Sequence, residues 1–228
     1  MLLHGGGTTV EESFSRQIPY FARSRLIVAP EQVGHGRTHD VAGPLSYMEM
    51  AEHTATLLDR LHIENADVLG WSDGGDVGLI LAARHPRLVH RLAVTGANIT
   101  PAADSDTPEV LTELQGWIPS EDKDGQARYE RLFADSAAHF VVFAQKLKQL
   151  WLTHPTPDEL STGILKQIQI PTLVMAGDHD VVRLEHTIGI FRSLPRARLF
   201  IVPNSPHNTL NEHADWLNPV IASFFAEK

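Results

Sequence analysis

Five short segments of the chain are apolar at nearly every position rather than at alternate ones. They are Leu26–Pro30, Asp67–Gly70, Arg91–Thr95, Thr172–Ala176 and Leu199–Val202. Strands that are covered on both faces of a parallel sheet have this pattern. The segments therefore predict a buried, mostly parallel sheet.

Amphipathic segments that are typical of helices lie between these strands. Ser46 followed by Glu49 is typical of a capping box, and it predicts a helix that runs to about Leu61. A second helix is expected from about Gly74 to His85, because Pro86 ends its pattern. The other two expected helices cover residues 183–194 and 211–226. Strands that alternate with helices indicate a doubly wound α/β sheet.

Residues from about 100 to 166 contain prolines and helical patterns but no strand pattern. That length is too great for a simple connection in a compact domain. We therefore predict a helical cap at 100–166, inserted between a first core part at 1–99 and a second core part at 167–228. Its aromatic residues are expected to face the pocket or the cap's own core, and they are Trp117, Phe133, Phe140, Phe143 and Trp151.

The candidate nucleophile is Ser72, in the segment Gly70-Trp71-Ser72-Asp73-Gly74. This Gly-x-Ser-x-Gly motif follows an expected strand and opens an expected helix, which is the context that the nucleophile turn of a hydrolase requires. A serine on so sharp a turn has strained backbone geometry, and side chains two residues before and after it would collide. A glycine-rich structural turn is the alternative interpretation.

A serine nucleophile needs a base, and the base needs an acid that orients it. His207 follows the strand Leu199–Val202, and Asp180 follows the strand Thr172–Ala176. The order Ser, Asp, His and the position of each after a strand favour a catalytic triad. Asp178 is the rival for the acid, and it could instead cap the following loop.

Two backbone amides are candidates for an oxyanion hole. The segment His4-Gly5-Gly6-Gly7 follows the first apolar residues, and we expect the amides of Gly6 and Asp73 to receive the oxyanion. The alternative for these glycines is a flexible start to the chain.

Composition limits the partners of the chain. Its 228 residues have a formal net charge of −9, which argues against a nucleic-acid or anionic-membrane partner. There is no cysteine, and no second histidine lies at ligand spacing from His179, so we expect no metal site. No apolar run approaches the length of a membrane span, and no signal-peptide pattern is present, so a cytoplasmic location is expected.

The residues around Ser72 resemble the α/β-hydrolase superfamily, in particular valacyclovir hydrolases (biphenyl-hydrolase-like proteins) and small bacterial esterases. The similarity covers Asp67–Gly75 and continues to Ala82–Pro86, and the turn Gly34–Thr38 resembles the family's Gly-His-Gly-Arg-Ser turn. The resemblance implies an α/β-hydrolase fold with a helical cap, an acid at Asp180 and a base at His207.

The family usually has two strands before its His-Gly loop, whereas this loop begins here after three residues. These N-terminal strands are therefore expected to be missing, which would leave one edge of the sheet bare. A truncated chain or a homo-oligomer that covers the edge would account for this departure.

We expect a carboxylic-ester hydrolase (esterase) that acts on small molecules through an acyl-enzyme and needs no cofactor. Trp71 and Asp73 are expected to contact the substrate. The Asp73 carboxylate would meet a substrate amino group, as the resemblance to valacyclovir hydrolases implies, or cap the helix that it opens. The alternatives are a lactonase, a carbon–carbon bond hydrolase on the same triad, and a ligand-binding or inactive homologue.

Overall fold

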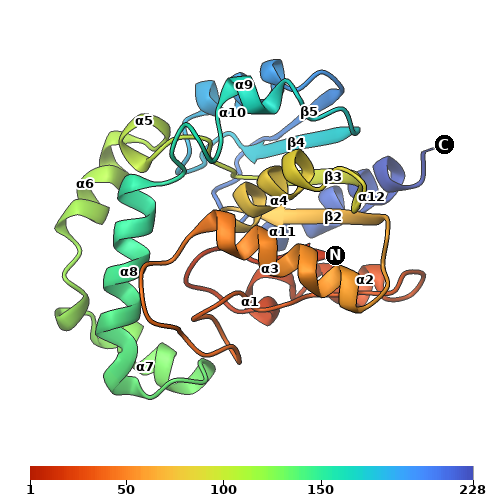
Figure 1. Cartoon of the computed structure of the whole chain (residues 1–228). Coiled ribbons are helices and arrows are strands. Elements are labelled where there is room, and N and C mark those ends of the chain that lie inside the picture. The colour runs from red at the N-terminus through yellow and green to blue at the C-terminus, as the bar shows by residue number, and fades with distance from the viewer. Residues whose placement is uncertain (228) are drawn as a thin grey trace.

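The computed structural model describes residues 1–227, and a parallel sheet of five strands lies at its centre (Figure 1). The strands are adjacent in chain order, and every neighbouring pair is parallel. They are β1 (Leu2–Leu3), β2 (Ala66–Trp71), β3 (Val89–Thr95), β4 (Thr172–Gly177) and β5 (Ala197–Val202). The parallel sheet confirms the fold class expected from the continuous apolar runs.

The strand expected at Leu26–Pro30 is wrong. This segment runs beside β1 and contributes one backbone hydrogen bond to it, from the Leu2 amide to the Val28 carbonyl at 2.9 Å. A ladder requires repeated hydrogen bonds between two segments, and within residues 1–227 this is the one backbone hydrogen bond that joins Leu26–Pro30 to β1. The side chain at the start of the segment, Leu26, is 80% exposed, so the apolar run is not buried on both faces.

Helices cover both faces of the sheet. Successive strand residues point to opposite sides, so each strand places apolar side chains against both helix layers. Val68 packs in one layer, with α3 (Tyr47–Arg60), α4 (Asp73–Arg84) and α10 (Leu184–Ser193). Leu69 packs in the other layer, with the helices α1 (Val10–Phe14), α2 (Gln17–Phe21) and α12 (Ala214–Phe225).

The expected helix boundaries agree closely with the observed ones, except near the C-terminus. Ser46 accepts a hydrogen bond from the Glu49 amide at the start of α3. The helix expected at 211–226 is two helices, α11 (Thr209–Glu212) and α12. They are separated at His213, whose backbone (φ −117°, ψ 34°) is not helical.

Residues 102–165 contain five helices, of which the first four lie beyond the end of the sheet to which β2 points, whereas the last packs against α4 and α10 (Figure 1). They are α5 (Ala102–Ser105), α6 (Pro108–Gly116), α7 (Lys123–Leu132), α8 (Phe140–Thr153) and α9 (Thr162–Leu165), with single 3₁₀ turns at Pro119–Glu121 and Ala137–His139. The division into 1–99, 100–166 and 167–228 remains a prediction. We call residues 100–166 the cap.

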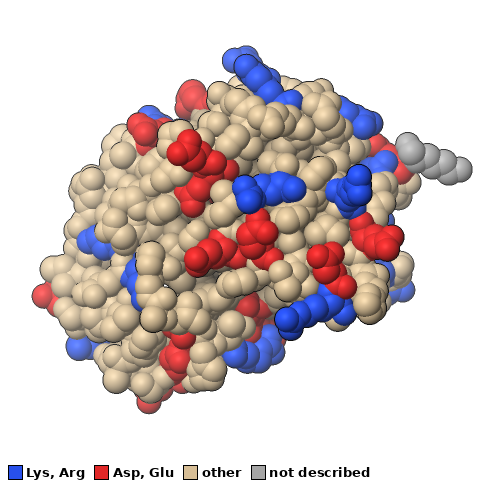
Figure 2. Space-filling model, in the orientation of Figure 1, with Lys and Arg blue, Asp and Glu red and all other residues tan. Residues whose placement is uncertain are grey.

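The surface charges are mixed in sign. Figure 2 shows acidic and basic side chains interspersed on one face of the molecule. None of the helices within residues 1–227 has the length and the apolar character needed to cross a membrane.

Candidate active site

Ser72 lies on the sharp turn between β2 and α4. Its backbone has φ 53° and ψ −126°, a conformation that costs a residue with a side chain roughly 1–3 kcal/mol. A Cβ at Gly70 would collide with the Gly74 carbonyl oxygen, and one at Gly74 would collide with that of Leu3. The close packing explains both glycines of the motif.

Ser72, His207 and Asp180 lie in one line of hydrogen bonds. The Ser72 hydroxyl lies 2.9 Å from Nε2 of His207, and the Nδ1 of His207 lies 2.6 Å from Oδ1 of Asp180. The Asp180 side chain is 1% exposed, and its Oδ1 also accepts the Val182 amide at 3.1 Å. The turns after β2, β4 and β5 thus bring together the three residues that the sequence placed there.

Gly96, in the turn after β3, makes room for the imidazole. Its φ of 61° is in the left-handed region, and a Cβ there would lie 2.7 Å from Cε1 of His207. A side chain at this position would therefore displace the ring. The sequence alone does not reveal this role, because the contact joins residues more than a hundred positions apart.

The pKa of His207 lies above the ordinary value for histidine. Burial opposes the charged imidazolium, but the hydrogen bond to Asp180 and the charge of that carboxylate favour it more strongly. The same contact holds the ring so that Nε2 faces Ser72. The histidine can therefore accept a proton from the serine, and the carboxylate can stabilise the resulting imidazolium.

Asp178 does not contact His207. Its carboxylate accepts the Ser205 amide at 3.1 Å, and it lies 2.8 Å from the ring of His179. Ser205 belongs to the turn that carries His207. Asp178 thus braces this turn, while Asp180 is the aspartate that lies against the imidazole.

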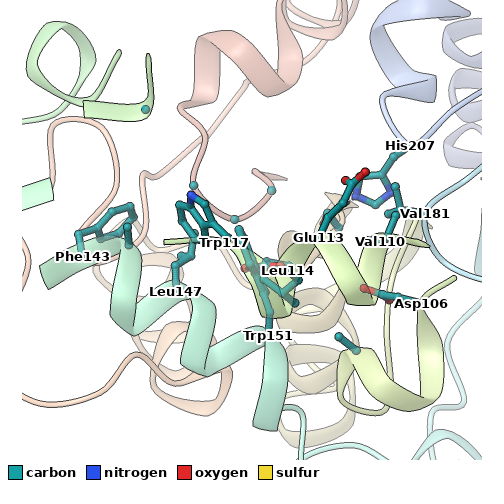
Figure 3. Close-up of a pocket in the computed structure, with 18 of the residues that line it drawn as sticks. Asp106, Val110, Glu113, Leu114, Trp117, Phe143, Leu147, Trp151, Val181 and His207 are labelled. Atoms are coloured by element: carbon teal, nitrogen blue, oxygen red, sulfur yellow. Dashed lines mark hydrogen bonds between the residues drawn. The ribbon is translucent and has the colours of Figure 1, made fainter. Parts of the chain in front are cut away.

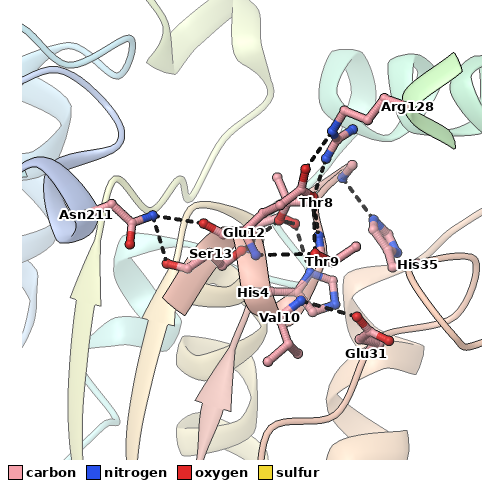
Figure 4. Close-up of polar contacts among 12 residues, drawn as sticks. His4, Thr8, Thr9, Val10, Glu12, Ser13, Glu31, His35, Arg128 and Asn211 are labelled. Carbon is pink, nitrogen blue, oxygen red and sulfur yellow. Dashed lines mark hydrogen bonds and ion pairs between the residues drawn. The ribbon is translucent and has the colours of Figure 1, made fainter. Parts of the chain in front are cut away.

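The glycine loop at residues 4–7 is held by polar side chains on both sides of Gly6 (Figure 4). The Gly5 amide donates to Ser13 Oγ at 3.4 Å, and the Gly7 amide donates to Nε2 of His35 at 3.0 Å. Within residues 1–227, the Gly6 amide donates no hydrogen bond. The loop therefore keeps one N–H available beside Ser72.

His35 is a buried, neutral histidine to which the sequence assigned no role. Its Nδ1 lies 2.9 Å from the Val33 carbonyl oxygen, so Nε2 is free to accept the Gly7 amide. Burial, reinforced by the neighbouring His4, lowers the pKa of His35 to about 3. The turn Gly34–Thr38 is the sequence feature that points to this role, because it brings His35 to the glycine loop.

Asp73 is buried between the core and the cap. Trp151 on α8 directs its indole N–H at both carboxylate oxygens, at 3.0 and 3.1 Å. A Cβ at Gly6 would collide with Oδ2, so the carboxylate rests on the glycine loop. Burial raises the pKa of Asp73 to about 6, although hydrogen bonds from Trp151 and Tyr47 oppose the rise. The carboxylate thus has a partner in residues 100–166, a contact that differs from capping of the helix that Asp73 opens.

Trp71 uses its polar atom on the protein. The indole N–H donates to the carbonyl oxygen of His207 at 2.9 Å, and the ring centroid lies 5.5 Å from that of the imidazole. The side chain also lines the cavity above Ser72.

A cavity of about 570 Å³ lies above Ser72 and His207. Figure 3 shows Phe143, Leu147 and Trp151 along α8, with Trp117 beside Leu147, and Val110 of α6 near His207. The expected cap aromatics all line it, and three of them also pack around Tyr129 at centroid distances of 4.5–5.7 Å. These three are Phe133, Phe140 and Phe143.

The charged side chains around the cavity are mainly acidic. Asp73, Asp106 and Glu113 line it, and Arg128 is the one lysine or arginine that does so within the described residues. Arg128 is held by Glu12 through two hydrogen bonds of 2.8 and 2.6 Å (Figure 4). Its charge is therefore already matched. No cluster of three or more metal-ligating side chains occurs within residues 1–227.

Residues 1–152 match the model of the alpha/beta hydrolase fold family. The chain belongs to this family and is a hydrolase.

The chain is similar to several known hydrolases. It is 28% identical to serine hydrolase BPHL of Homo sapiens, over 98% of this chain and 78% of that one. It is 26% identical to 2-hydroxymuconate semialdehyde hydrolase of Pseudomonas sp. (strain CF600), over 100% of this chain and 86% of that one. The crystal structure of a mutant of the meta-cleavage product hydrolase CumD is similar to this structure, with a TM-score of 0.80 and 25% sequence identity. The similarity covers 100% of this chain and 90% of that one.

Proposed function

We propose that the chain hydrolyses carboxylic esters through an acyl-enzyme on Ser72. The hydrogen-bonded line from Ser72 through His207 to Asp180 carries this proposal. His207 takes the hydroxyl proton as the serine oxygen attacks the ester carbonyl, and it gives that proton to the leaving alcohol. In the second step His207 takes a proton from water, whose oxygen attacks the acyl group. It then returns the proton to Ser72 Oγ as the acyl–oxygen bond breaks.

The amides of Gly6 and Asp73 are the proposed oxyanion donors. Gly6 lies on the glycine loop and Asp73 at the start of α4, and both line the cavity together with Ser72. The neighbouring Gly5 and Gly7 amides are already bonded, which fixes the loop before the substrate arrives. Donors fixed in this way need no rearrangement when negative charge develops on the carbonyl oxygen.

Carbon–carbon bond hydrolysis is the second candidate, because the Pseudomonas relative is a 2-hydroxymuconate semialdehyde hydrolase. A muconate substrate carries a carboxylate, which needs a cation in the pocket. Here the cavity presents Asp73, Asp106 and Glu113, and Arg128 is bound to Glu12. The charges therefore favour neutral or cationic esters over an anionic dienoate.

Asp73 supports the narrower proposal that the ester carries an amino group. Its carboxylate lies beside Ser72 and borders the cavity, and Trp151 donates one N–H between its two oxygens. A substrate ammonium would add a charged partner to an anion that has neutral hydrogen-bond donors. A partly desolvated pair of that kind supplies discrimination of a few kcal/mol between amine-bearing and neutral esters.

The first test is labelling of Ser72 by a fluorophosphonate, with hydrolysis of p-nitrophenyl acetate measured in parallel. Ser72→Ala should abolish labelling and nearly all hydrolysis while the folded state is retained. Rates for a muconate-type dienoate, a lactone and an amino-acid ester then compare the substrate classes. A chain that is folded but neither labelled nor active on any of them would support the ligand-binding alternative.

A further inference from the structure

Trp71 and Ser72 are neighbours in the chain, and both bind the same histidine. The Trp71 indole N–H donates to the His207 carbonyl oxygen at 2.9 Å, while the Ser72 hydroxyl lies 2.9 Å from its Nε2. One contact fixes the backbone of His207 and the other fixes its ring. The end of β2 therefore holds the histidine at two points.

Close packing fixes the direction of the Trp71 N–H. The residue is 8% exposed, and a Cβ at Gly5 would lie 2.9 Å from its Cε3. The imidazole of His207 is a second neighbour of the indole ring. Because the ring is packed against both, it cannot turn away from the carbonyl without disturbing the glycine loop.

The remainder of the turn is fixed at other positions. The Ser205 amide donates to Asp178, and the Thr209 hydroxyl donates to the Pro206 carbonyl at 2.5 Å. Within residues 1–227, the indole is the one donor in contact with the His207 carbonyl. Removing it would leave the backbone at the base of the imidazole without a direct hydrogen bond.

We propose that Trp71 is a positioning residue that holds His207 in place during deacylation. The inference rests on the proposed acyl-enzyme mechanism. In the acyl-enzyme, Ser72 Oγ is bonded to the acyl carbon and has no hydrogen to donate, so the Ser72–His207 hydrogen bond of the free enzyme is lost. The Trp71 contact involves no reacting atom and persists while Nε2 takes a proton from water.

Trp71→Phe should therefore slow deacylation more than acylation. The loss of one neutral hydrogen bond corresponds to about a three- to tenfold slower step. With p-nitrophenyl acetate, the acyl-enzyme should accumulate in acid-quenched samples analysed by mass spectrometry. The values of kcat and KM should fall together, while kcat/KM, which reports acylation, stays nearly unchanged. Simple destabilisation of the site would lower kcat/KM as well.

A second substitution separates the N–H from the shape of the ring. Site-specific replacement of Trp71 by 3-benzothienylalanine keeps two fused rings but has sulfur where the N–H was. It should slow deacylation as Trp71→Phe does. The matched control is Trp216→Phe, because Trp216 is 52% exposed on α12 and outside the cavity. This control should behave like the wild type.

The outcomes distinguish the inference from the proposed function. Unchanged deacylation in both Trp71 replacements, or equal losses in the two steps, would overturn the positioning role while Ser72 still forms an acyl-enzyme. Failure of the wild type to form any acyl adduct at Ser72 would instead overturn the proposed function.

Discussion

Acidification should destabilise the fold through His35, the buried histidine that holds the glycine loop. Its imidazole accepts the Gly7 amide at Nε2, so protonation there replaces an acceptor with a donor. The pKa is lowered to about 3 by burial and by the neighbouring His4, whereas an unfolded chain has the ordinary value of 6.5. At pH values between about 3 and 6.5, His35 is therefore protonated in the unfolded state but neutral in the folded state.

The sign and size of the effect follow from these two pKa values. The contribution of His35 to the free energy of unfolding is complete above about pH 6.5 and is lost as the pH falls towards 3. At about pH 5 the loss is roughly 1.5 pH units times 1.36 kcal/mol, or about 2 kcal/mol.

Urea unfolding measured at about pH 8 and pH 5 for the wild type, His35→Gln and His35→Leu tests this prediction. Neither variant has the titrating ring, so the stability advantage of the wild type over each should shrink by about 2 kcal/mol at the lower pH. The glutamine oxygen can still accept the Gly7 amide, so His35→Leu should lose more esterase activity than His35→Gln. Advantages that are equal at both pH values would refute a neutral, buried His35.

Three further predictions concern the reaction. Asp180→Asn should lower kcat far more than Asp178→Asn, and the reverse order would move the orienting acid to Asp178. The kcat/KM of an uncharged ester should rise with pH through a pKa above 6.5, because His207 must be neutral to act as a base; a flat profile between about pH 5 and 9 would contradict this. Asp73→Ala should lower kcat/KM for an amino-acid ester at least tenfold more than for a neutral ester of about the same size, and equal losses would leave Asp73 a structural role.

The sheet and most helices could be predicted because their signals are local. The apolar runs at β2–β5 and the cap residue Ser46 are properties of neighbouring positions. Leu26–Pro30 has the same local pattern, but whether it becomes a strand depends on hydrogen bonds to a segment distant in the chain, and it makes one such bond with β1. The break at His213 was also missed, because the apolar period continues across it.

The proposed triad could be located because each member follows a strand, and parallel strands end at the same edge of a sheet. The contacts that support these three residues could not be predicted from the sequence. The partner of the Trp71 indole is 136 residues away along the chain, and that of the Trp151 indole is 78 residues away. In sequence, both residues are large apolar side chains, and their N–H groups acquire a meaning only when the fold brings an acceptor to them.

Asp73 shows why a residue beside the nucleophile needs its tertiary partners to be understood. An anion next to a developing oxyanion opposes the reaction, so an aspartate there requires a compensating contact. Trp151 supplies one from the cap, and its single N–H lies between the two oxygens and leaves the carboxylate facing the cavity. With a pKa of about 6, the group is mostly ionised at neutral pH. A cationic substrate would neutralise the rest of the Asp73 charge. The unfavourable effect of the carboxylate on the oxyanion would therefore be smallest when such a substrate is bound.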